Sequence, residues 1–287
     1  MASNQHKKQM RTILVPTDFS ENAKKALQFA QAIAERNAAR ISLFNAYSPP
    51  AVDPSLPVET WVTLADQTEK VNADALEALE KECVKKGFKC TTKQELGPAS
   101  EVILDEIKAQ KPILVVMGRT GKGGWLDKLM GSVASAVAVK ALCPVLVLPP
   151  DTHTKTIRRI VYATELERPE ANALGFAFNL AEHFNADLTL VKVDAPFEVN
   201  VFEDEEFKED IVKEFGEKKY NLIAIKADSV VSGIQDYADE HHIDLIVMAT
   251  RKRDWLAELI NPSVAKKMVL DTHVPVLVYH LEQVVTI

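Results

Sequence analysis

Residues 113–132 read ILVVMGRTGKGGWLDKLMGS and hold five of the ten glycines in the chain. The stretch opens with the continuous apolar run 113–117, which is typical of a parallel β-strand covered on both faces. It ends at Ser132, where a helical pattern of apolar residues begins. Backbone N–H groups at the start of a helix bind anions, and glycine lets a ligand approach them because it has no Cβ. The stretch therefore predicts an α/β fold with an anion site after this strand.

Length and composition limit the classes of protein to consider. The chain has 287 residues, which suggests two domains of roughly 150 residues each. A formal net charge of −7 argues against a protein that binds nucleic acid or an anionic membrane surface, because such proteins normally carry a basic surplus. No apolar run approaches the ~20 residues that span a bilayer. We therefore expect neither a nucleic-acid partner nor a membrane partner.

The three cysteines, Cys83, Cys90 and Cys143, are few and lack the spacing of metal ligands. They indicate reduced thiols that pack as small apolar side chains. The start of the chain, MASNQHKKQM, is not followed by the apolar segment of a signal peptide. These observations predict a cytoplasmic location.

The chain contains an internal repeat. Residues 11–47 and 158–193 each combine a short apolar run, a Thr followed by an acid, a helical pattern ending in Asn, and a second apolar run. Residues 113–149 and 244–280 resemble each other in the same way, with a Trp, a Ser-Val-Ala triplet and a closing Pro-Val-Leu-Val. We therefore expect two tandem domains, residues 1–150 and 151–287, joined by the polar stretch PPDTHTKT (149–156).

Within each half, strands and helices alternate. Strands are expected near 12–16, 40–46, 88–94, 113–117 and 144–148, and again near 157–162, 187–193, 220–226, 244–248 and 275–279. Helices in the first half are expected near 21–36, 60–86, 99–110 and 132–141. Such alternation predicts two tandem doubly wound α/β domains, each a five-stranded parallel sheet flanked by helices in a Rossmann-like arrangement.

The ligand site of such a sheet lies where the strand order reverses, beyond the carboxyl ends of the strands. If the first strand is central, this point lies between the first and the fourth strand, so Pro16, Thr17 and Asp18 face the glycine-rich stretch. A phosphate chain fits such a crevice best, although the glycines are also compatible with a tight loop that binds nothing. The stretch lacks the spacing of a P-loop, and no G-x-G-x-x-G follows the first strand.

A specific motif identifies a family. Gly118, Gly121, Gly131 and Ser132 form the G-x2-G-x9-G-[S/T] pattern of the universal stress protein family, which the chain resembles. ILVPTDFS (13–20) and CPVLVLP (143–149) are similar to the first and last strands of that family. The resemblance extends over nearly the whole chain as two tandem domains, and only the first half matches the motif without a gap.

The resemblance implies that the first half binds ATP. Adenine and ribose would lie beside Pro16, Asp18, Ala46, Met117 and Gly118, and Mg²⁺ would arrive with the nucleotide because no carboxylate cluster is present to hold it. In the loop, Arg119 and Lys122 either neutralise phosphate charge or are solvated cations. The candidate nucleotide-binding residues are Pro16, Thr17, Asp18, Ala46, Met117, Gly118, Arg119, Gly121, Lys122, Gly131, Ser132 and Val133.

The second half departs from the motif. Ala249 stands where the first half has Gly118, and Asn261-Pro262 replaces the third glycine. Proline has no N–H to donate, and a Cβ atom obstructs the approach of a phosphate. The acid after the first strand is Glu165, one methylene longer than Asp18. We therefore expect no ATP binding of the family's kind in this half, which has a structural or regulatory role.

The closing strands 145–148 and 276–279 are apolar and would be exposed edges if each half stood alone. We expect them to cover each other in an intramolecular pseudo-dimer, as family members pair, and further pairing into a homodimer is compatible with this. The leading functional hypothesis is an ATP-binding stress-response or signalling protein. The alternatives are slow ATP hydrolysis or phosphotransfer at the same site, for which Asp18 is the only candidate base, and a scaffold that binds no nucleotide.

Overall fold

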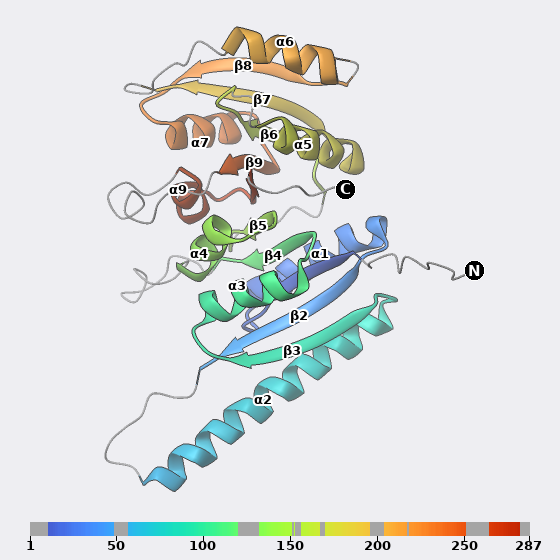
Figure 1. Cartoon of the computed structure of the whole chain (residues 1–287), viewed down its shortest axis with the longest axis vertical. Helices are drawn as coiled ribbons and strands as arrows, with labels where there is room; N and C mark the ends of the chain where they lie inside the picture. Colours follow the sequence, from blue (N-terminus) through green and yellow to red (C-terminus); the bar gives the residue numbers. More distant parts are fainter. Residues whose placement is uncertain are drawn as a thin grey trace, which may run out of the picture.

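The computed structural model describes residues 11–48, 57–119, 132–150, 152, 156–166, 170–195, 204–216, 218–250 and 264–281. These residues form one ten-stranded sheet with helices on both faces (Figure 1). The strands are β1 (Thr12–Pro16), β2 (Arg40–Tyr47), β3 (Cys90–Leu96), β4 (Leu114–Gly118), β5 (Val145–Leu148), β6 (Arg159–Ala163), β7 (Asp187–Asp194), β8 (Asn221–Lys226), β9 (Leu245–Thr250) and β10 (Val276–His280). The helices are α1 (Glu21–Asn37), α2 (Val58–Lys85), α3 (Ala99–Gln110), α4 (Ser132–Lys140), α5 (Ala171–Phe184), α6 (Asp204–Phe215), α7 (Val230–Glu240) and α9 (Val264–Asp271).

The strand order is β3-β2-β1-β4-β5-β10-β9-β6-β7-β8. Each half contributes five parallel strands, and its first strand lies between its second and its fourth. The order therefore reverses between β1 and β4, as the predicted doubly wound fold requires. The predicted fold class is confirmed, and the strands lie within about two residues of their predicted bounds. The inner strands β1, β4 and β5 are nearly fully buried apolar runs, whereas the edge strands β3 and β8 are partly exposed.

Two apolar cores lie on opposite faces of this sheet. One contains buried residues of α1, α2, α5 and α6, and the other contains buried residues of α3, α4, α7 and α9. Helix α1 illustrates why the sequence folds this way: its buried residues, from Ala23 to Ala34, recur with helical spacing. Its N-cap is Ser20, whose hydroxyl accepts a hydrogen bond from the N–H of Ala23 at 3.2 Å.

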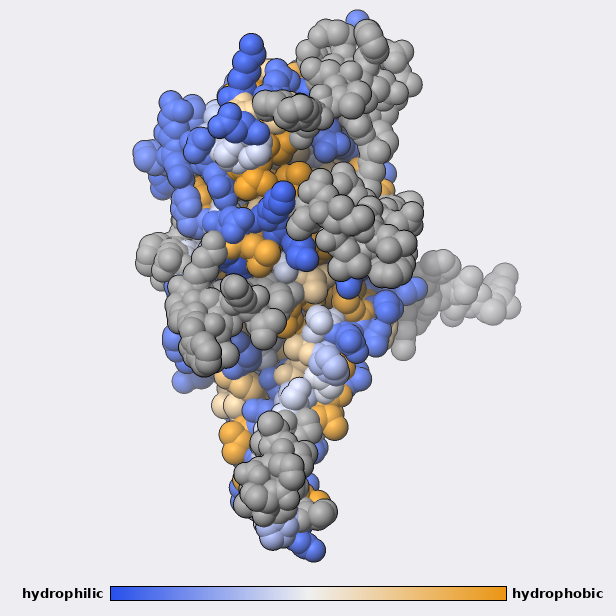
Figure 2. Space-filling view, turned by 90° about the vertical axis from the view of Figure 1, so that its left-hand side faces the viewer, coloured by the Kyte–Doolittle hydropathy of each residue, from blue (hydrophilic) through white to orange (hydrophobic). Residues whose placement is uncertain are grey.

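The edge helix α2 extends beyond the strand that it covers. It has 28 residues and is therefore about 42 Å long, whereas β3 has seven residues. Figure 1 shows α2 running along β3 at one end of the molecule. Two of its exposed apolar side chains are Val62 and Val71, and Figure 2 shows apolar residues among hydrophilic ones at this narrow end. None of the described helices is both long enough and apolar enough to cross a membrane.

The two halves meet where β5 and β10 pair in antiparallel fashion. Val145 lies opposite Val278, Leu146 opposite Leu277, and Val147 opposite Val276. All six side chains are at most 2% exposed. Each closing strand therefore completes the hydrogen-bonding edge of the other, which would otherwise invite association with further chains.

The repeat is visible in the backbone as well as in the sequence. Phe19 and Leu166 both adopt the left-handed conformation, with φ angles of 63° and 58°. Each N–H is bound by the hydroxyl of the threonine two residues earlier, at 3.0 Å in the first half and 2.9 Å in the second. Further left-handed pairs at equivalent helix ends are Ala38 with Asn185 and Lys111 with His242. The two halves therefore share the turn that leads from the first strand into the first helix.

We predict that Leu277→Ala lowers the free energy of unfolding by about 2–5 kcal/mol, because it removes a buried side chain from the β5–β10 seam. Leu142→Ala is the control, since Leu142 is 54% exposed and should change stability by less than about 0.5 kcal/mol. Urea denaturation of both variants measures the difference. Equal effects would contradict the importance of the seam.

Candidate functional site

A cleft of about 320 Å³ opens at the carboxyl ends of β1, β2 and β4. Figure 2 views the molecule from the side on which β2 and β3 end. The residues that line the cleft are Pro16, Thr17, Asp18, Ser20, Asn22, Ala23, Phe44, Ala46, Ala99, Ile103, Met117, Gly118, Val133 and Ala134. All of them come from the first half of the chain.

The first turns of three helices border this cleft. Asn22 and Ala23 belong to the first turn of α1, Ala99 begins α3, and Val133 and Ala134 follow the first residue of α4. The first four N–H groups of an α-helix have no partner within the helix, and the helix dipole places partial positive charge there. The arrangement therefore favours an anionic ligand.

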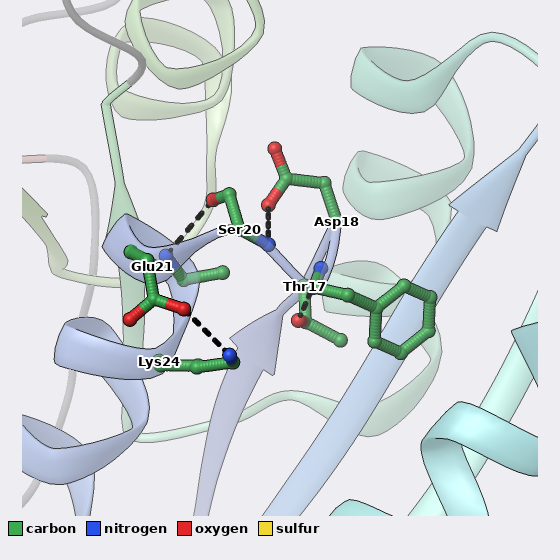
Figure 3. Close-up of polar contacts among 7 residues, drawn as sticks. Thr17, Asp18, Ser20, Glu21 and Lys24 are labelled. Atoms are coloured by element: carbon green, nitrogen blue, oxygen red, sulfur yellow. Dashed lines mark hydrogen bonds and ion pairs between the residues drawn. The ribbon is translucent and has the colours of Figure 1, made fainter.

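Thr17, Asp18 and Ser20 form the turn between β1 and α1, shown in Figure 3. The N–H of Thr17 donates to the carbonyl of Phe44 at 2.8 Å, which ties this turn to β2. One carboxylate oxygen of Asp18 accepts the N–H of Ser20 at 3.0 Å. In Figure 3 the other oxygen of Asp18 points away from the turn. Asp18 thus presents an acceptor at the wall of the cleft.

Gly118 allows α1 to approach the end of β4 closely. A Cβ atom at this position would lie 2.8 Å from the backbone carbon and oxygen of Asn22. The side-chain amide of Asn22 donates to the carbonyl of Arg119 and, at 3.3 Å, to the carbonyl of Leu148. These bonds hold the first turn of α1 against the ends of β4 and β5, where one side of the cleft forms.

The structure brings seven of the twelve candidate residues together at the cleft. They are Pro16, Thr17, Asp18, Ala46, Met117, Gly118 and Val133. Ser132 begins α4 next to Val133. Gly121, Lys122 and Gly131 lie outside the described residues. Residues just before the undescribed segment 120–131 and just after it therefore line the same cleft.

The side chain of Arg119 lies elsewhere than the sequence predicted, which was beside a phosphate or in solvent. It is only 7% exposed, and its guanidinium donates to the carbonyl of Thr272 in the second half at 2.7 Å. Its side chain is therefore neither a solvated loop cation nor part of the cleft lining. Its backbone carbonyl lies beside the site, where it accepts the hydrogen bond from Asn22. Arg119 joins the two halves instead.

Sequence reasoning did not assign seven lining residues to the site. They are Ser20, Asn22, Ala23, Phe44, Ala99, Ile103 and Ala134. The positions of Asn22, Ala23 and Ala134 in first turns next to predicted site residues are a usable signal, because the loop that enters such a helix faces the carboxyl edge of the sheet. Ala99 and Ile103 gave no such signal, since α3 follows the outer strand β3.

Among the described residues, no group of three or more His, Cys, Asp or Glu side chains could hold a metal ion. Asp18 is the one carboxylate among the described lining residues.

The second half has a buried carboxyl group in the segment that corresponds to residues 17–23 of the first half. The repeat aligns without a gap from Thr17 with Thr164 to Ala23 with Glu170. Glu170 is 4% exposed, and it accepts hydrogen bonds from the Thr164 hydroxyl at 2.7 Å and from the N–H of Glu165 at 2.9 Å. Burial raises the pKa of Glu170 to about 7. A buried acid thus stands at the sequence position that Ala23 holds in the first half.

Comparisons with known proteins agree with this geometry. The sequence profile of the universal stress protein family matches residues 10–149 and 156–280. Universal stress protein MJ0531 of Methanocaldococcus jannaschii is 33% identical over 143 residues, which are 48% of this chain and 81% of that protein. Universal stress protein Rv2623 of Mycobacterium tuberculosis is 27% identical over 195 residues, which are 67% of this chain and 65% of that protein. The crystal structure of a universal stress protein from Archaeoglobus fulgidus shares the fold with a TM-score of 0.73 at 18% identity, and the match covers 94% of this chain and 96% of that one.

We predict that Gly118→Ala destabilises the protein by about 1–3 kcal/mol, because the new Cβ forces the first turn of α1 away from β4. The control is Gly175→Ala within α5, where the nearest atom would be Phe215 Cζ at 3.9 Å. This control should stabilise the protein by about 0.5–1 kcal/mol, since alanine favours a helix interior. Denaturant titrations compare the two, and a stable Gly118→Ala protein would contradict the close approach.

We predict that Glu170→Gln removes a pH dependence of stability. The pKa of Glu170 is raised from 4.5 to about 7 in the folded protein, so the folded state holds a proton that the unfolded state releases within this range. The free energy of unfolding of the wild type should therefore fall by roughly 3 kcal/mol, relative to the glutamine variant, as the pH rises from about 4.5 to 7. Above this range the difference should be constant.

Denaturant titrations at several pH values measure this difference. Glu240→Gln, which changes an exposed carboxylate at the end of α7, is the control and should keep the wild-type slope. Parallel pH curves for the wild type and Glu170→Gln would contradict a buried, protonated Glu170.

Proposed function

The chain belongs to the universal stress protein family, and we propose that it is a stress-response protein that binds ATP in its first half. The observation that carries this proposal is the convergence of three helix first turns on one cleft beside the glycine motif. A triphosphate is the ligand whose charge suits those turns. The cleft volume of about 320 Å³ falls within the range of small-molecule sites.

The apolar part of the cleft suits a nucleoside. Pro16, Ala46, Met117, Phe44 and Ile103 offer the surface against which an adenine ring packs. Asp18 lies on the same wall and has a carboxylate oxygen for the ribose hydroxyl groups. Hydrogen bonds of this charge-assisted kind contribute about 1.5–3 kcal/mol each.

The phosphates would extend from Gly118 towards α4. Val133 lines the cleft there, and Ser132 stands at the first position of the helix. The motif residues Gly121 and Gly131 would contribute backbone N–H groups, with Lys122 as a cation and Mg²⁺ bound to the nucleotide. Three or four such bonds together with base packing account for the roughly −8 kcal/mol of a micromolar complex.

We propose that the second half binds no ATP and serves as a structural or regulatory partner. Glu170 puts a larger, buried side chain at the sequence position of Ala23, which leaves less room for a ligand beside this turn. Ala249 and Pro262 replace two glycines of the motif. The β5–β10 pairing and the bond from Arg119 to Thr272 support an intramolecular pseudo-dimer of units 1–150 and 151–287. We propose that it acts in the cytoplasm.

Slow ATP hydrolysis is the alternative from the enzyme class. Asp18 is the only carboxylate among the described lining residues, and its partner is a backbone N–H rather than a group that orients a base. Incubation of co-purified nucleotide with the protein distinguishes the alternatives. Intact ATP supports binding, catalytic release of ADP supports hydrolysis, and the absence of nucleotide supports a scaffold.

We predict that Asp18→Ala weakens ATP binding by about tenfold or more, because it removes a charge-assisted acceptor. Gly131→Val should abolish binding, since its side chain obstructs the phosphate path. The matched control is Glu165→Ala, which changes the equivalent acid of the second half and should leave the affinity unchanged. Calorimetric titration of the full chain with Mg-ATP measures all three.

Circular dichroism and urea unfolding show whether each variant remains folded. If folded Gly131→Val binds ATP with wild-type affinity, the nucleotide does not use the glycine motif. If Glu165→Ala loses affinity as Asp18→Ala does, the assignment of the site to the first half fails.

A further inference from the structure

We propose that Cys83 and Cys90 form a reversible redox pair that closes to a disulfide when the folded protein meets a peroxide. The proposal does not depend on nucleotide binding, because neither residue lines the cleft. It concerns the outer edge of the first half, where α2 lies along β3 (Figure 1).

The chain brings the two sulfurs together through a short turn. Cys83 lies in the last turn of α2, and Cys90 is the first residue of β3. The N–H groups of Lys86 and Phe88 both donate to the carbonyl of Cys83 at 3.1 Å, so the chain folds back on itself. Gly87 makes the reversal with a φ angle of 90°. The two side chains interact electrostatically across this turn, and the Cys90 thiol also lies 3.9 Å from the carbonyl oxygen of Thr91.

The surroundings of the pair stabilise a thiolate. The side-chain amide of Gln31, from α1, donates to the Cys83 sulfur at 3.2 Å. The interaction with the Cys90 side chain, followed by the hydrogen bond from Gln31, lowers the pKa of Cys83 to about 7, and Lys86 lowers it further while Glu82 opposes it. Because the two thiols interact, the pair as a whole loses its first proton near neutral pH.

The third cysteine is a natural control. Cys143 is 3% exposed, and burial alone raises its pKa to about 12. It therefore remains a neutral thiol, which is not a nucleophile. Cys83 is also buried, but its partner Cys90 is partly exposed at the start of an edge strand. Cys90 is thus the more exposed member of the pair.

The reaction balances with one molecule of hydrogen peroxide. The thiolate attacks one peroxide oxygen, so an S–O bond forms, the O–O bond breaks, and hydroxide leaves and takes up a proton as water. The second thiol then attacks the sulfenic sulfur, so the S–S bond forms and a second water leaves. The two thiols lose two electrons and two hydrogens, and the peroxide is reduced to two waters. A dithiol reductant reverses the change.

The test treats the folded full-length protein with stoichiometric hydrogen peroxide at neutral pH. We expect the intact mass to fall by two hydrogens and a non-reducing peptide map to link Cys83 to Cys90. Cys143→Ser should react as the wild type does, and Cys90→Ser should form no intramolecular link. The rate should rise with pH around neutrality, and Gln31→Leu should move this inflection upward and slow the reaction at neutral pH by about tenfold.

Two results would overturn the proposal. One is a folded protein in which Cys90 is oxidised without a link to Cys83, and the other is a link that forms only after the protein is unfolded. An inflection that stays unchanged in folded Gln31→Leu would remove the role of Gln31. ATP titration of the oxidised protein keeps this test separate from the nucleotide proposal, because oxidation at this edge should leave the affinity unchanged.

Discussion

The reversal of strand order between β1 and β4 is the constraint on which the candidate site depends. Strands on either side of this point connect to helices on opposite faces of the sheet, so the first turns of α1 and α4 flank one opening. Because Gly118 has no Cβ, α1 packs directly against the end of β4. The side-chain amide of Asn22 holds α1 there by donating hydrogen bonds to two backbone carbonyls, those of Arg119 and Leu148. The polarity of the cleft follows from this backbone arrangement rather than from charged side chains.

The two halves of the chain share this backbone arrangement but differ in the side chains that surround it. The turn after the first strand is retained, as the matching left-handed residues Phe19 and Leu166 show. Where the first half has Ala23, however, the second half has Glu170, whose buried carboxyl group accepts hydrogen bonds from the turn. A shared backbone therefore does not by itself imply a shared ligand. The antiparallel seam of β5 and β10 joins the two halves.

The sequence predicted the features that local patterns determine. Strand positions followed from short apolar runs, and the position of α1 followed from the helical spacing of its apolar residues. Contacts between distant residues were not predictable in this way. Arg119 looked like a loop cation, but its partner Thr272 is 153 residues away. Likewise, Cys83 and Cys90 looked like isolated packing residues until the turn at Gly87 brought their sulfurs together.

The central claim is that one adenine nucleotide binds per chain, in the cleft beside Pro16, Ala46 and Met117. A crystal structure of the full chain grown with Mg-ATP tests it most directly. The account predicts a single nucleotide, with its base against these residues and its phosphates at the first turn of α4. Nucleotide beside Glu170 in the second half, or a first-half cleft that stays empty at saturating Mg-ATP, would contradict it.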